Sequence, residues 1–464
     1  MTSGSGDAIE VVNPATGRAF ERVARASVDD CLDAVRVAHG AAPAWRATAP
    51  RVRAEALRRA YELMMADHER LARLITMENG KVLADARAEV AYAAEFFRWF
   101  GEEAVRIDGD YRRAPGGANW VLVMRQPVGV SLLATPWNFP AAMATRKIGP
   151  ALAAGCTVVV KPASDTPLTT LAIAEILARA GVPEGVVSVV VPQPPGEAVR
   201  AMLESGLVRK LSFTGSTPVG AALLAQAAPR IINCSMELGG NAPLVVFADA
   251  DLDVAVDGAM LAKMRNGGAA CTAANRMYVH ADVHDAFVER FTARMSALRV
   301  GDGLEPSTTL GPMVSAAQRT RIAGLVERAV EGGARVACGG RVAAGDGFGY
   351  EATVLTHVAP DAPWLREEIF GPVAPIVRFG DGDDVVRWSN DVEHGLVSYV
   401  FSRDVGRAMR VAESLETGMV GLNRGLVSDP AAPFGGVKAS GLGREGAHEG
   451  LLAFLETKYV AGNW

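Results

Sequence analysis

Residues 210–227 read KLSFTGSTPVGAALLAQA, and this stretch decides the fold class. The apolar run at 210–213 is typical of a buried strand, a glycine-rich turn follows it, and residues 217–227 have the composition of a helix. The same alternation occurs upstream, with strands expected at 128–134, 157–160 and 186–191 and helices at 167–180 and 198–204. Because buried strands that alternate with helices form parallel sheets, the sequence predicts a doubly wound α/β region.

The rest of the chain extends this pattern. The first hundred residues look helical, with a capping signature that begins at Ser27, and residues 51–78 continue in a helical pattern. Thr166 is expected to cap the helix that follows it. A hairpin-like ribbon is expected at 111–126, and a second series of strands and helices begins near residue 243. The sequence therefore predicts two α/β regions and one small β element.

Composition excludes several classes of protein. The chain has 464 residues, of which 49% are hydrophobic and 21% charged, as in ordinary globular proteins. A dispersed net charge of −5 argues against nucleic-acid binding, and no apolar run approaches the ~18 residues that span a membrane. Five widely spaced cysteines form no disulfide framework, and the MTSGSGD start is no secretion signal, so we expect a cytoplasmic protein.

Three motifs suggest other chemistry but lack the right context. Residues 441–446 match G-x-G-x-x-G, yet they follow no predicted strand and only 18 residues remain after them. The turn at 215–220 has P-loop spacing, but Ala221 stands where a phosphate-binding lysine is needed. His280 and His284 lie four residues apart without the glutamate of a zinc-protease helix. We therefore expect neither NTP hydrolysis nor a metal site.

Four positions could carry chemistry, and each also has a purely structural interpretation. The turn at 215–220 could offer backbone N–H groups to a phosphate, or be a plain tight turn. Cys271, in NGGAAC, could be a nucleophile or a buried structural thiol. Glu237, between apolar residues, could be a base with a raised pKa or a salt-bridged carboxylate. Asn138, in the rigid TPWNFP turn, could donate to an oxyanion or close an Asx turn.

Together and in this order, the motifs resemble those of the aldehyde dehydrogenase superfamily. The matching stretches span most of the chain: TPWNFP at 135–140, KPAS at 161–164, FTGSTPVG at 213–220, MELGGN at 236–241, Cys271, EEIFGP at 367–372 and PFGGVKASGLGRE at 433–445. Within the family, the stretch at 141–164 and the end of the chain are most similar to succinate-semialdehyde dehydrogenases.

The resemblance implies a fold of two doubly wound parallel-sheet domains with a small β oligomerisation element. Its dinucleotide-binding domain is expected at 1–108 and 128–239, and its catalytic domain at 240–440. The oligomerisation element is expected at 109–127 and 441–464, which implies a homodimer or homotetramer. No nucleic-acid or membrane partner is implied.

The resemblance also implies NAD(P)-dependent oxidation of an aldehyde. Cys271 is expected to attack the aldehyde carbon to give a thiohemiacetal. The Asn138 amide and the Cys271 N–H are expected to bind the oxyanion that forms. Hydride transfer to the nicotinamide leaves a thioester, and Glu237 activates the water that hydrolyses it. The residues expected at the cofactor are Trp137, Lys161, Ser164, Gly215, Ser216, Gly220, Glu368 and Phe370.

Two positions bear on the cofactor itself. Ser164 stands where NAD-preferring members often carry Glu, which favours NADP over NAD, although the adjacent Asp165 is acidic. Lysine is rare in this chain, at seven of 47 basic residues, so a lysine within a motif indicates that arginine does not serve there. Lys161 is one of these seven.

For the substrate, Arg146, Arg265 and Ser428 match the succinate-semialdehyde pattern and suit a carboxylate at the far end of a short aldehyde. Succinate semialdehyde is therefore the expected substrate. The pattern is interrupted at Ala269, Met264 and Arg424, which suggest a wider and more cationic pocket and make glutarate semialdehyde an alternative. Two alternatives of another class are a non-redox thiol esterase and a catalytically silent binding protein.

Overall fold

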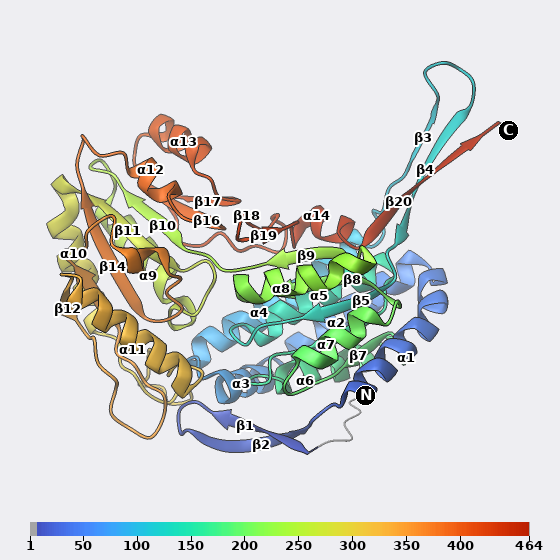
Figure 1. Ribbon diagram of the computed structural model, residues 1–464, viewed down its shortest axis with the longest axis horizontal. Helices are drawn as coiled ribbons and strands as arrows, with labels where there is room; N and C mark the ends of the chain where they lie inside the picture. Colours follow the sequence, from blue (N-terminus) through green and yellow to red (C-terminus); the bar gives the residue numbers. More distant parts are fainter. Residues whose placement is uncertain (1–6, 464) are drawn as a thin grey trace.

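The computed structural model describes residues 7–463 and contains two large α/β sheets (Figure 1). In Figure 1 the strands of the first sheet lie in the larger part of the molecule, beside the N-terminal helices, and those of the second sheet lie in the other part. The predicted α/β class with parallel-sheet domains is confirmed. The first six residues of MTSGSGD, and Trp464 at the end of the expected oligomerisation element, lie outside the described residues.

The first sheet is doubly wound, as predicted. Its strand order is β19-β9-β8-β5-β6-β7, and all neighbours are parallel except β19, which runs antiparallel to β9. Its strands are β5 (Val130–Ala134), β6 (Val158–Lys161), β7 (Val187–Val189), β8 (Val208–Thr214), β9 (Asn233–Glu237) and β19 (Gly441–Leu442). The connections carry α5 (Pro140–Ala154), α6 (Leu168–Arg179), α7 (Gly196–Glu204), α8 (Thr217–Ala227) and η1 (Ala228–Arg230).

The N-terminal segment contributes a hairpin and four helices to this part of the molecule. They are β1 (Ala8–Asn13), β2 (Arg18–Ala24), α1 (Val28–Ala47), α2 (Pro50–Ala66), α3 (His68–Asn79) and α4 (Leu83–Glu103). The capping box of Ser27 and Asp30 is confirmed. The helical pattern expected at 51–78 is divided in two, because the chain leaves helical geometry at Asp67.

Thr166 does not cap α6, so that prediction was wrong. The Thr166 hydroxyl lies 3.4 Å from the Trp137 carbonyl oxygen, to which it donates. The first N–H groups of α6 instead donate to the buried carboxylate of Glu78 on α3, from Leu168 at 2.8 Å and from Thr169 at 3.0 Å. A carboxylate accepts two N–H groups at once and favours the positive end of a helix, so this distant residue replaces a local cap.

The second sheet has the order β12-β13-β14-β11-β10-β16-β17 and is parallel except at β12. Its strands are β10 (Ala242–Val246), β11 (Ala274–His280), β12 (Arg335–Cys338), β13 (Thr353–Thr356), β14 (Val373–Phe379), β16 (Val397–Phe401) and β17 (Met419–Leu422). Its helices are α9 (Leu252–Met264), η2 (Arg265–Gly268), α10 (Ala281–Ser296), α11 (Ala316–Glu331), η3 (Pro363–Arg366), α12 (Val385–Asn390) and α13 (Val405–Ser414).

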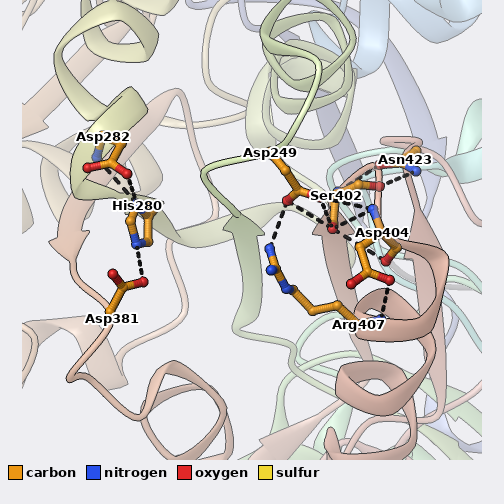
Figure 2. Close-up of polar contacts among 8 residues, drawn as sticks. All are labelled: Asp249, His280, Asp282, Asp381, Ser402, Asp404, Arg407 and Asn423. Carbon is orange, nitrogen blue, oxygen red and sulfur yellow. Dashed lines mark hydrogen bonds and ion pairs between the residues drawn. The ribbon is translucent and has the colours of Figure 1, made fainter.

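A polar network fixes one edge of this second sheet (Figure 2). The Asp249 carboxylate, after β10, accepts hydrogen bonds from the Ser402 hydroxyl at 3.0 Å and from Arg407 at 2.9 Å. The Asn423 side chain pairs with both backbone groups of Ser402. These contacts connect the ends of β16 and β17 with the start of α13, and they stabilise this part of the fold.

A three-stranded antiparallel sheet projects from the body of the molecule (Figure 1). Its middle strand is β4 (Trp120–Pro127), between β3 (Asp110–Arg113) and β20 (Leu455–Gly462), so the ribbon expected at 111–126 is present. The remaining short elements are β15 (His394–Gly395), β18 (Val437–Lys438) and α14 (Ala447–Leu452). The proposed domain boundaries stay predictions. Over residues 7–463, no helix is long and apolar enough to cross a membrane.

Candidate active site

A cavity of about 250 Å³ lies where loops from both large sheets meet. Trp137 follows β5, Gly215 and Ser216 follow β8, and Leu238 and Gly239 follow β9, so the carboxyl ends of parallel strands form one wall. The opposite wall comes from the second α/β unit. Ligands on doubly wound sheets bind at this edge, so the topology itself marks the cavity as the site.

The cavity brings together ten of the fourteen residues predicted for the site. These are Trp137, Asn138, Arg146, Gly215, Ser216, Arg265, Cys271, Glu368, Phe370 and Ser428. They come from segments more than two hundred residues apart, so their convergence is a property of the fold and not of local sequence. The other four, Glu237, Lys161, Ser164 and Gly220, are not part of its lining. The roles given to all fourteen stay predictions.

Cys271 is partly exposed and follows η2. Burial raises the pKa of its thiol to about 12, while the positive charge of Arg146 acts in the opposite direction. A thiol whose pKa is raised must lose its proton as it attacks. The loop after Glu237 packs against this segment so closely that a Cβ on Gly240 would lie 2.1 Å from the Cys271 carbonyl oxygen. Only glycine fits there.

Glu237 ends β9 and is buried beside the cavity. Its pKa is raised well above the ordinary value, first by burial and then by the neighbouring carboxylate of Glu445. Glu445 is itself ionised, because Lys147 and Arg146 lower its pKa; Lys147 donates to its Oε1, and Arg146 lies 3.5 Å from its Oε2. Glu237 Oε2 has no hydrogen-bond partner among the described residues. A carboxylate with a raised pKa and a free oxygen suits a general base.

The Asn138 amide points away from its own backbone, which disfavours the Asx-turn interpretation. Its Nδ2 donates at 3.0 Å to the carbonyl oxygen of Ala269, two residues before the cysteine. Asn266 joins the same group, because its Nδ2 donates to the Asn138 carbonyl oxygen at 2.7 Å and to that of Ala269 at 3.1 Å. Asn266 adopts a left-handed backbone (φ 53°) to reach both. The amide donor and the cysteine loop are thereby held together.

The residues expected at the cofactor form two groups. Glu368 lies in the cavity, where its Oε1 accepts from the Gly240 N–H at 3.0 Å, and burial raises its pKa to about 7. The Phe370 ring stands edge-on to Trp137 at 5.2 Å. Ser216 is the N-cap residue of α8 and lines the cavity, and its side chain makes no capping bond. These residues fit a nicotinamide dinucleotide, for which the start of α8 would hold the pyrophosphate and Glu368 a ribose.

The second group lies outside the main cavity. Lys161 ends β6, donates to the Pro162 carbonyl oxygen at 2.7 Å, and has its pKa lowered to about 8 by burial. Ser164 lines a separate small pocket with Asp165, whose pKa is raised by burial. Gly220 packs on Leu238, since a Cβ there would lie 2.3 Å from that side chain. Close helix packing is therefore the observed reason for this glycine.

Two guanidinium groups line the cavity over aromatic rings. Arg265 lies 4.9 Å from the centre of the Phe139 ring, and its Nη1 donates to the Ser428 hydroxyl at 3.2 Å. Among the described residues no carboxylate lies within ion-pair distance of Arg265. Arg146 lies 4.2 Å from the centre of the Phe434 ring, and its Nε has no hydrogen-bond partner within residues 7–463. Arg146 is buried and Arg265 is half-buried, and two cations with spare donors suit an anionic group.

None of the three departures from the family pattern lines this cavity. Arg424 is exposed, and neither it nor Met264 nor Ala269 lines the cavity, so the expectation of a more cationic pocket through Arg424 was wrong. Residues not predicted for the site also line it, among them Tyr92, Phe139, Met143, Gln318, Arg321 and Phe434. Phe434 belongs to the PFGGVKASGLGRE motif, whereas Tyr92 lies on α4, where no sequence motif marks it as a site residue.

The two histidines of the HADVH stretch have separate partners. Figure 2 shows the His280 ring between Asp282 and Asp381, with its Nε2 3.1 Å from Asp381 Oδ1. His280 ends β11 and accepts from the Asp282 N–H, while His284 on α10 contacts Asp285. No group of three or more His, Cys, Asp or Glu within residues 7–463 could hold a metal ion.

Comparison with known proteins agrees with this geometry. Residues 1–460 match the model of the aldehyde dehydrogenase family. The chain is 51% identical to a succinate-semialdehyde dehydrogenase of Paenarthrobacter nicotinovorans, over 94% of this chain and 97% of that protein. It is 49% identical to a glutarate-semialdehyde dehydrogenase of Pseudomonas aeruginosa, over 98% and 94%. The crystal structure of an Escherichia coli NADP-dependent enzyme superposes with a TM-score of 0.98 at 47% identity, covering 100% and 96%.

Proposed function

The chain belongs to the aldehyde dehydrogenase family, and from that premise we propose that it oxidises succinate semialdehyde to succinate with NADP. As a member of this family it is an enzyme that oxidises an aldehyde with a nicotinamide cofactor. The substrate assignment depends on one observation, namely that Arg146 and Arg265 line the same cavity as Cys271. Two guanidinium groups there can bind a carboxylate while the aldehyde carbon meets the thiol.

The proposed reaction begins at the Cys271 sulfur. The thiol releases its proton to solvent as its sulfur bonds to the aldehyde carbon, and the oxygen that becomes negative accepts hydrogen bonds from the Asn138 amide and the Cys271 N–H. When bound, NADP supplies the hydride acceptor. The thioester that remains on Cys271 is attacked by water, and Glu237 takes the proton of that water as the carbon–sulfur bond breaks. The acid is released, and Glu237 passes the proton to the departing sulfur, which restores both the thiol and the carboxylate.

Glutarate semialdehyde is the alternative substrate, one methylene longer, and the name of the Pseudomonas relative favours it. We assign the preference for NADP to Ser164, since a serine lacks the charge that would repel a 2′-phosphate. The E. coli structure described as NADP-dependent supports this choice. We also propose a homodimer or homotetramer in the cytoplasm, where a reducing environment keeps Cys271 and the other four unpaired cysteines as thiols.

The test is the rate of reduced-cofactor formation by purified protein with succinate semialdehyde and, in parallel, glutarate semialdehyde. We expect turnover with both NADP and NAD, a higher kcat/KM with NADP, and loss of turnover in Cys271→Ala. An equal or higher kcat/KM with NAD would contradict the role of Ser164. Turnover of a thioester or activated ester in the absence of any detectable cofactor binding would favour the non-redox esterase instead.

A further inference from the structure

We propose that Lys81 and Glu89, a buried ion pair from the junction of α3 and α4, are positioning residues that hold the Asn138 amide in the oxyanion hole. The proposal rests on the role proposed for Asn138 but not on the identity of the aldehyde. Neither residue lines the cavity, so each acts through Asn138 and not on the substrate.

Lys81 contacts the oxyanion loop directly. Its Nζ donates to the Asn138 backbone carbonyl oxygen at 2.8 Å and to Glu89 Oε2 at 2.5 Å. The ammonium also lies 4.2 Å from the centre of the Phe139 ring. Both charged side chains are almost completely buried, at 1% and 0% exposure. The Asn138 peptide is therefore held in one orientation by a charge that water does not screen.

Glu89 fixes the other end of the same loop. Its Oε1 accepts from the N–H groups of Ala141 at 2.9 Å and Ala142 at 3.3 Å, in the first turn of α5. The residue at the N-cap position, Phe139, has no side chain that can cap this helix. Glu89 thus supplies the missing cap from α4. One ion pair anchors the loop on both sides of Pro140.

The same face of α4 also holds the cysteine loop. Asp85 lies one turn before Glu89, and its Oδ2 accepts from the Asn266 N–H at 3.0 Å. Asn266 in turn donates to the Asn138 carbonyl oxygen, which thereby receives hydrogen bonds from both Lys81 and Asn266. The amide donor and the segment that carries Cys271 are therefore aligned by one turn of one helix.

The burial of this pair is poorly explained by stability alone. Taking two charges out of water costs much of what their attraction returns, and apolar replacements of buried pairs are often neutral. Lysine is also rare in this sequence, yet four of its seven lysines, Lys81, Lys147, Lys210 and Lys263, are buried. A compact ammonium fits between one carboxylate oxygen and one carbonyl oxygen, where a planar guanidinium does not. A positioning role explains both why this pair is buried and why the cation is a lysine.

The test is a double-mutant cycle on the rate of the first NADPH formed in a single turnover. Lys81→Met keeps the length of the side chain and removes its donor. We expect a fall of about 10- to 100-fold in this rate constant, with KM and the Kd for NADP within about threefold of the wild type. In an Asn138→Ala background, Lys81→Met is expected to cost less than about threefold, because the donor that Lys81 positions is gone. Glu89→Gln is expected to behave in the same way.

Lys210→Met is the matched control. It removes another buried lysine of the same α/β unit, which donates to Asn233 and Ser235 at 2.8 Å, and it is expected to leave the single-turnover rate unchanged. An equal loss from Lys81→Met with and without Asn138 would show a general structural defect and overturn the proposal. If Lys81→Met fails to fold, the isosteric Glu89→Gln completes the cycle. If Asn138→Ala alone has no effect, the role proposed for Asn138 fails as well, a result distinct from failure of Lys81 alone.

Discussion

At the residue scale, the carboxyl group of Glu237 is expected to control how the reaction depends on pH. Burial and Glu445 raise its pKa well above the ordinary ~4.3. Only the ionised carboxylate can accept a proton from water, so thioester hydrolysis is expected to increase as the pH rises through this elevated pKa and to fail below it. Turnover limited by hydrolysis, measured from about pH 5 to about pH 9, checks this dependence. A rate independent of pH would contradict it, and Glu237→Gln is expected to retain the first turnover while losing the later ones.

The residues that a motif can predict are those whose chemistry is local. Cys271, Asn138 and the turn after β8 stand out in the sequence, and they converge on one cavity. Tyr92 and Arg321 could not be predicted for the site, because they reach it from helices with no motif. Lys81 carried one usable signal, the rarity of lysine, but its partners are fixed only when α4 packs against the loop after β5.

At the element scale, Glu78 is expected to matter more for stability than Thr166. Glu78→Ala leaves the first two N–H groups of α6 without an acceptor, one buried and one part-buried, so we expect a loss of about 2–4 kcal/mol in the free energy of unfolding. Thr166→Val removes one long hydrogen bond to Trp137 and is expected to cost about 1 kcal/mol or less. Denaturant unfolding of both variants measures the difference. A larger loss of stability from Thr166→Val than from Glu78→Ala would contradict this and support Thr166 as the cap of α6.

The boundaries of helices could likewise be predicted where local sequence fixes them and not where a distant residue does. Helix α8 has the predicted bounds of Thr217 and Ala227, because Pro218 and the glycine-rich turn before it fix the start within the sequence. The cap of α6 was misassigned to Thr166, because the acceptor for its first N–H groups is Glu78, some ninety residues away in the sequence. A periodic apolar pattern likewise did not reveal the break at Asp67, where α2 ends and α3 begins.

At the scale of the whole molecule, the projecting sheet is the expected contact between subunits. Within residues 7–463, the outer edges of β3 and β20 pair with no further strand, and Tyr111 and Tyr459 on them are more than half exposed. Light scattering of the full chain is expected to give a dimer or tetramer. Truncation after residue 454, which removes β20, is expected to lower the mass toward that of a monomer. A full-length protein that is already monomeric would contradict this assignment.

The central claim is that the cavity selects an aldehyde with a carboxylate at its far end, and Arg265→Ala tests it most directly. The measurement is kcat/KM for succinate semialdehyde and for butanal, which has the same chain length but no carboxylate. We expect Arg265→Ala to lower the first value by about 10- to 100-fold and the second by less than about twofold, because one charge-assisted hydrogen bond contributes about 1.5–3 kcal/mol. Arg424→Ala, at an exposed arginine outside the cavity, is the control and is expected to change neither value. An equal loss on both aldehydes in Arg265→Ala, or a wild-type enzyme that prefers butanal, would contradict the account.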